Sequence, residues 1–152
     1  MLGTSDYRNA FVKLAESQGY SHTSSAMKDP RNPKDEVHVV EVKRAGSEFS
    51  VSVAFFAASA ALVVADGLGY VAESGRDKAK IVLEALNAKS PGVEFCMDRG
   101  RISARAWTQV KADRREDKRS EMARDALKTA NRVIAVLTRA YDPLSRALEG
   151  CV

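Results

Sequence analysis

The stretch EFSVSVAF, from Glu48 to Phe55, shows the clearest secondary-structure pattern in this sequence of 152 residues. Phenylalanine and valine alternate with small or polar residues, which is the period-two pattern of a strand with one buried face. Burial of its four large apolar side chains contributes roughly 1.5–3 kcal/mol each before the loss of chain entropy is subtracted. The stretch therefore predicts a strand whose inner side belongs to the core of a sheet.

Further strands are predicted on both sides of this stretch. The segment Val37–Lys43 is rich in valine, and a third strand is expected at Ala61–Val71, after an alanine-rich connection over Ala57–Ala61. Two glycines, Gly67 and Gly69, are expected to bend the end of the third strand. A second hairpin is predicted after the middle of the chain, with strands at Val93–Asp98 and Ile102–Val110 around a tight turn.

Helices are predicted before, between and after these strands. The first is expected at Ser5–Gln18, the second from about Ser74 to Lys89, and the third from Asp113 until Pro143 interrupts it. The segment Ser21–Glu36 carries two prolines among serines and charged residues, and we expect it to be a loop. The apolar stripes follow the helical spacing of three and four residues, as in Tyr7, Ala10, Phe11, Leu14 and Ala15.

The element order predicts an α+β fold in one domain covering residues 1–152. Its order is α-β-β-β-α-β-β-α, with an antiparallel five-stranded sheet packed on helices. The hydrophobic content of 45% and charged content of 29% are typical of a globular protein.

A net charge of +4 permits contact with nucleic acid or an acidic partner without demanding it. No signal peptide is expected, and the apolar run Val51–Ala65 is too short to cross a bilayer, so we expect a cytoplasmic protein.

The residues that usually carry catalysis or bind metals are sparse and scattered. The chain has two cysteines, Cys96 and Cys151, and two histidines, His22 and His38, which are too few and too far apart for a zinc site. We expect Cys96 to be a buried or half-buried strand thiol, His22 to lie in a loop and His38 to face solvent on a strand. No glycine-rich phosphate loop is present. The sequence thus predicts no enzyme, no cofactor and no metal.

Three stretches resemble the YbjN family, whose fold is shared by the class I chaperones of bacterial type III secretion. They are ALVVADGLGYV at residues 61–71, LEALNA at residues 83–88 and VEFCMDRGRISARAWTQV at residues 93–110. The likeness is one of element order and hydrophobicity, over roughly Ser5 to Tyr141. It implies a single-layer antiparallel sheet packed on helices, homodimerisation, and a non-enzymatic role in binding or regulating another protein.

The strand at residues 102–110 supplies the candidate partner-binding residues. If Ile102, Ala104, Ala106 and Val110 face the core, then Ser103, Arg105, Trp107 and Gln109 face the other way. A tryptophan beside an arginine on an outer sheet face is typical of a binding hot spot. We therefore select Arg101, Arg105 and Trp107, the only tryptophan, as a partner-binding surface. The alternative is that this face is covered, or that Trp107 packs against its own domain.

Two classes of function remain open. The first is a non-enzymatic protein-binding protein, chaperone-like or regulatory, that acts as a homodimer on a partner the sequence does not identify. The alternative is a small basic nucleic-acid-binding module that uses Arg101, Arg105 and Trp107 together with the basic run from Lys111 to Arg124. Acidic residues are interleaved through this run and would pair with its basic residues, so we interpret the run itself as a solvated helix face.

Overall fold

The computed structural model describes residues 4–56, 60–109 and 118–149 as three α-helices, one short 3-10 turn and six strands. The sequence prediction of an α+β fold is confirmed. In chain order the elements are α1 (Thr4–Ser17), β1 (Tyr20–Asp29), β2 (Asn32–Arg44), β3 (Ser50–Phe56), β4 (Ala60–Tyr70), η1 (Glu73–Gly75), α2 (Arg76–Lys89), β5 (Glu94–Asp98), β6 (Arg101–Gln109) and α3 (Lys118–Leu148).

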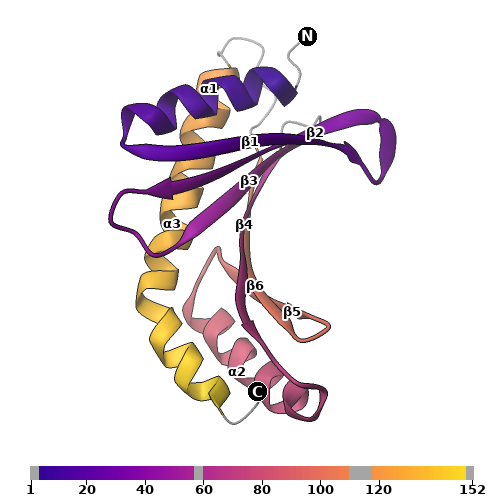
Figure 1. Cartoon of the computed structure of the whole chain (residues 1–152), viewed down its shortest axis with the longest axis vertical. Coiled ribbons are helices and arrows are strands. Elements are labelled where there is room, and N and C mark those ends of the chain that lie inside the picture. Colours follow the sequence, from indigo (N-terminus) through magenta and orange to yellow (C-terminus); the bar gives the residue numbers. More distant parts are fainter. Residues whose placement is uncertain (1–3, 57–59, 110–117, 150–152) are drawn as a thin grey trace.

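The six strands form one antiparallel sheet in the order β1-β2-β3-β4-β6-β5. All three helices lie on one side of this sheet, as Figure 1 shows, with α3 running along most of its length. We call the side that the helices cover the inner face and the opposite side the outer face. The molecule therefore has two layers, and the described helices leave the outer face without a second layer.

The inner face forms the core by the alternation predicted at Glu48–Phe55. Val51, Val53 and Phe55 of β3 are buried, and Val53 stands opposite Val63 of β4, which stands opposite Ala106 of β6. Helix α1 adds its stripe to this core through Phe11, whose ring centre lies 5.4 Å from that of Phe55. The central strand and the first helix are therefore those that the sequence predicts.

The segment from Ser21 to Glu36 is not a loop, so the prediction of five strands is wrong. It forms most of β1 and the beginning of β2, and the observed order is α-β-β-β-β-α-β-β-α. Almost every residue of β1 is exposed, so the strand lacks the apolar alternation that identifies buried strands. Its two prolines are compatible with this arrangement because Pro30 lies in the turn and Pro33 at the start of β2.

Helix α3 continues through Pro143 to Leu148, although the sequence analysis predicts an interruption at this proline. A proline inside a helix costs one backbone hydrogen bond and crowds the carbonyl one turn earlier, and packing can offset that cost. Beyond the proline, Leu144 and Leu148 are both buried in the core. The beginning predicted at Asp113 lies outside the described residues, as does the connection at residues 57–59.

The two histidines have structural partners, and His38 lies on a strand as predicted, whereas the loop predicted for His22 is wrong. His22 lies on β1, where its Nε2 is 2.6 Å from Oε1 of Glu16. His38 does not face solvent: it is only 8% exposed, and its ring nitrogens lie 2.9 Å from Arg8 and 3.4 Å from Glu36. Each histidine therefore joins α1 to the sheet, His22 through Glu16 and His38 through Arg8.

Two side-chain contacts fix the end of the sheet that carries β5. The Asn87 amide of α2 donates to the Phe95 carbonyl at 3.0 Å and accepts from the Phe95 N–H at 2.6 Å. The turn between β5 and β6 uses Arg99 and Gly100, which both have positive φ angles, and the Gly100 carbonyl accepts a hydrogen bond from Val71. Strand β4 is irregular between Ala65 and Gly69, as its glycines predict.

Tyr20 connects the start of β1 to α3. Its side chain is 5% exposed, and its hydroxyl donates a hydrogen bond to the Asn131 amide oxygen. Burial raises the pKa of Tyr20 above its ordinary value of 10.0, although the neighbouring Arg44 acts in the opposite direction. In the folded protein the neutral, hydrogen-bonded form is therefore favoured.

We expect Tyr20→Phe to lower the free energy of unfolding by about 1 kcal/mol near pH 8, because a buried hydrogen bond is lost. This difference should shrink as the pH rises above about 10, because the unfolded chain of the original protein then releases the Tyr20 proton before the folded chain does. Urea unfolding of both proteins at about pH 8 and pH 10.5 measures it. A difference that stays constant or grows would contradict the assignment.

Candidate functional site

The outer face carries a strip of apolar side chains that no described helix covers. Directly opposite one another across four strands stand Val39, Ala54, Leu62 and Trp107. The first three are half-buried, whereas Trp107 is 51% exposed. With the half-buried Phe56 and Val64 they form what we call the outer strip: Val39, Ala54, Phe56, Leu62, Val64 and Trp107.

Trp107 is held at the end of this strip by a neighbouring ring. Its ring centre lies 5.7 Å from that of Phe56, with the two planes tilted by 43°. Tilted aromatic pairs at this separation are favourable. The predicted direction of Trp107 is therefore confirmed, and it packs against its own sheet while half of it stays accessible.

The alternation predicted for β6 is confirmed over its described side chains. Ile102, Ala104 and Ala106 are buried on the inner face, whereas Arg105 and Trp107 are exposed on the outer face. Val110 lies outside the described residues, and the side chain of Gln109 is not among those described. Arg101 lies further along the same face of β6, beyond Arg105, so the sheet brings all three predicted partner-binding residues to one face.

Both arginines are paired with carboxylates. Arg105 lies 3.1 Å from Glu94 of β5, and Arg101 lies 2.9 Å from Asp66 of β4. All four side chains are exposed, so each ion pair contributes little to stability and leaves its groups available to a partner. The sequence alone does not identify these acids, because only the register of the neighbouring strands places them beside the arginines.

The row that contains Arg105 runs from an acid on β2 to the ion pair between Arg105 and Glu94. Glu41 of β2 stands opposite Ser52 of β3, which is followed across the sheet by Val64, Arg105 and Glu94. Glu41 is exposed, as is Arg105. The outer strip is thus bordered by an acid on the β2 side and by the Arg105–Glu94 ion pair on the β6 side.

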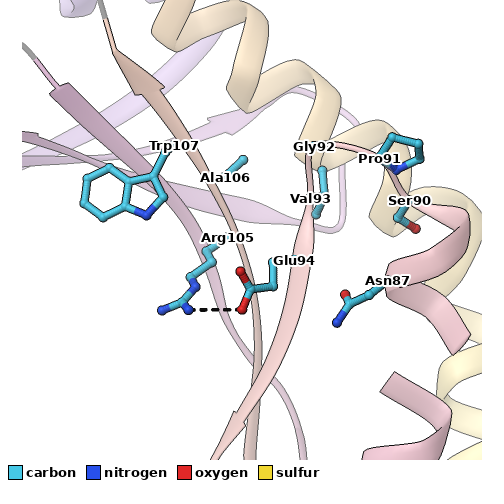
Figure 2. A pocket seen from close by; sticks show the side chains of 9 residues that line it. All are labelled: Asn87, Ser90, Pro91, Gly92, Val93, Glu94, Arg105, Ala106 and Trp107. Carbon is cyan, nitrogen blue, oxygen red and sulfur yellow. Dashed lines mark hydrogen bonds and ion pairs between the residues drawn. The ribbon is translucent and has the colours of Figure 1, made fainter. Parts of the chain in front are cut away.

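A shallow hollow of about 390 Å³ lies where β6 extends beyond the start of β5. Its lining includes Trp107, Arg105 and Glu94 together with Asn87 and the segment 90–93. Figure 2 shows the Trp107 and Arg105 side chains extending to one side of β6, while Asn87 lies on the far side of β5. The Asn87 amide is already hydrogen-bonded to the Phe95 backbone. The hollow therefore offers a partner mainly apolar surface and one ion pair.

The described residues contain no group of three or more His, Cys, Asp or Glu side chains placed to hold a metal ion. Cys96, half-buried as predicted, has its thiol 3.1 Å from the Ser103 hydroxyl on the outer face. Among the described helices, none combines the length and the hydropathy that crossing a membrane requires. Cys151 and the part of the basic run from Lys111 to Asp117 lie outside the described residues.

The fold of this chain resembles that of a solved structure. YbjN from E. coli, described as a candidate transcription regulator, superposes on this chain with a TM-score of 0.54 and 14% sequence identity, covering 93% of both chains. The likeness shows the fold, and it confirms the YbjN-like architecture that the three sequence stretches predict. No protein-family model and no curated protein matches the sequence.

Proposed function

We propose that this chain is a non-enzymatic, regulatory or chaperone-like protein that binds other proteins and acts as a homodimer through its outer face. The observation that carries the proposal is the half-exposed Trp107 on a strip of apolar side chains that no described helix covers. Apolar surface removed from water contributes about 25 cal/mol per Å², and tryptophan is the residue type most enriched at binding hot spots.

The charges at the border of the outer strip favour a second copy as the occupant. A two-fold axis parallel to the strands, between β3 and β4, places Arg105 of one copy opposite Glu41 of the other. The same axis places Trp107 opposite Val39 of the other copy. In a symmetric interface each such contact occurs twice, so one complementary pair contributes two favourable contacts to the dimer. Face-to-face sheet packing of this kind is common in proteins.

A regulatory role agrees with the description of YbjN as a candidate transcription regulator. A nucleic-acid-binding role would require free cationic groups on the same face. Arg101 and Arg105 each have a carboxylate within 3.1 Å, and these negative charges would repel a phosphate backbone, which favours a protein partner. We therefore treat nucleic acid as the alternative that an experiment must distinguish.

We expect the protein to be a dimer at tens of micromolar and Trp107→Glu to raise the dimer dissociation constant about a hundredfold or more. The reason is that each interface would contain two buried carboxylates in place of two indole rings. Size-exclusion chromatography with light scattering measures the change. Glu41→Arg should weaken the dimer by a smaller factor, because it places like charges opposite one another.

Ile81→Glu is the matched control, since it adds the same charge at an exposed apolar residue on α2, on the helical side. It should leave the dimer intact. A strict monomer at tens of micromolar, or a Trp107→Glu variant that dimerises normally, would contradict the proposal. Salt-sensitive quenching of Trp107 fluorescence by oligonucleotides at low ionic strength would favour the nucleic-acid alternative instead.

A further inference from the structure

The helical side of the molecule has an apolar groove between α2 and the last part of α3. Helix α2 buries Ala79 and Leu83 but leaves a second apolar edge turned towards α3. Two adjoining hollows of about 300 and 330 Å³ lie along this edge and share Leu86, Lys89 and Pro143. Figure 1 shows that these parts of α2 and α3 lie at the end of the molecule far from α1.

The groove is apolar at one end and cationic at the other. The apolar end is lined by Val82, Ala85, Ala147 and Ile81, the last of which is 68% exposed. The other end contains Arg139 and Lys89, which are the charged side chains among the described residues that line the two hollows. The described acids next to the lining in sequence, Glu84 and Asp142, line neither hollow.

We infer that this groove binds an amphipathic helix of a partner protein, with carboxylates placed beside Lys89 and Arg139. The walls are two α-helices, whose backbone groups are hydrogen-bonded within each helix and offer no edge to an added strand. An incoming helix satisfies its own backbone and needs only apolar side chains at the i, i+3, i+4 and i+7 spacing. From Ile81 to Lys89 the groove is about 12 Å long, slightly more than two helical turns.

The charges select an acidic partner helix over a second copy of this chain. Pairing the groove with itself would bring the cations of both copies into one interface, and the described lining residues supply no acid to either copy. Such like-charge contacts oppose association. A partner with glutamate or aspartate beside its apolar stripe gives each cation a counter-ion instead. The inference goes beyond the proposed dimer, because it concerns the opposite side of the molecule.

The test uses a fluorescein-labelled helical peptide of about 16 residues that carries leucines along one face and glutamates beside them. We expect saturable binding by fluorescence anisotropy, and a matched peptide with lysine in place of glutamate should bind at least about tenfold more weakly. The double variant Lys89→Glu/Arg139→Glu should reverse this preference. Ile81→Asp should weaken binding of both peptides, because it places a charge in the apolar end.

Lys80→Glu is the control, since Lys80 is exposed on α2 but lines neither hollow. It should preserve the preference for the acidic peptide. Trp107→Glu separates this inference from the proposed dimer: peptide binding that survives this substitution supports the groove, and binding that is lost would place the peptide on the outer face. Absence of saturable binding, or equal binding of both peptides, would overturn the inference and leave the dimer test unaffected.

Discussion

Replacing Gly100 by alanine is expected to lower the free energy of unfolding by about 3 kcal/mol, which is a large part of the stability of a domain this size. Gly100 has a φ angle of +85°, and a Cβ atom added to it would lie 2.2 Å from the Val71 carbonyl oxygen. The backbone of the turn would have to move, and the hydrogen bond between Val71 and Gly100 would be strained. Urea unfolding followed by Trp107 fluorescence measures the change.

Gly46→Ala is the matched control for this substitution. Gly46 has nearly the same backbone angle, +83°, but nothing lies within 4 Å of the added Cβ. The control should therefore show only the cost of the left-handed conformation, about 1 kcal/mol. Equal destabilisation by the two substitutions would mean that the contact with Val71 has no energetic consequence.

We expect Phe55→Ala to lower the free energy of unfolding by about 4 kcal/mol. The Phe55 ring is fully buried and packs against Phe11, so it joins the sheet to α1. Its removal loses both the burial of the ring and the contacts of the atoms around the cavity. Thermal and urea unfolding followed by circular dichroism measure the loss.

The next residue in the chain provides the control. Phe56 is half-buried on the outer face, where it contacts Trp107. Phe56→Ala should lower the free energy of unfolding by only about 1 kcal/mol, since water already reaches this ring. If the two variants were equally destabilised, the assignment of inner and outer faces to β3 would be wrong.

The sequence predicts those helices and strands in which buried side chains recur at a regular spacing. Strand β3 alternates between a buried and an exposed face, and α1 has a single apolar stripe, so both are found from local pattern alone. Strand β1 is different. Tyr20 is its only buried residue, and the strand is held by its pairing with β2. Its formation depends on the neighbouring strand, which local hydrophobicity does not reveal.

Some features of the candidate surfaces can likewise be predicted from local pattern, whereas others depend on the tertiary fold. Alternation along β6 predicts that Arg105 and Trp107 share an exposed face, and this prediction is confirmed. The carboxylate beside each arginine and the acid at the far border of the outer strip depend on strand order and register. The groove depends on Ile81 of α2 and Ala147 of α3 lining the same hollow, although they are distant in sequence.

The pair of hydrogen bonds between Asn87 and Phe95 has a consequence for solubility. An edge strand presents unpaired N–H and C=O groups, and a strand of another molecule can pair with them and extend the sheet. Such pairing is the first step towards fibrils. The carboxamide of Asn87 imitates the peptide group of an absent neighbouring strand and occupies both groups of Phe95. A strand added at β5 would therefore have to displace Asn87 before it could pair with Phe95.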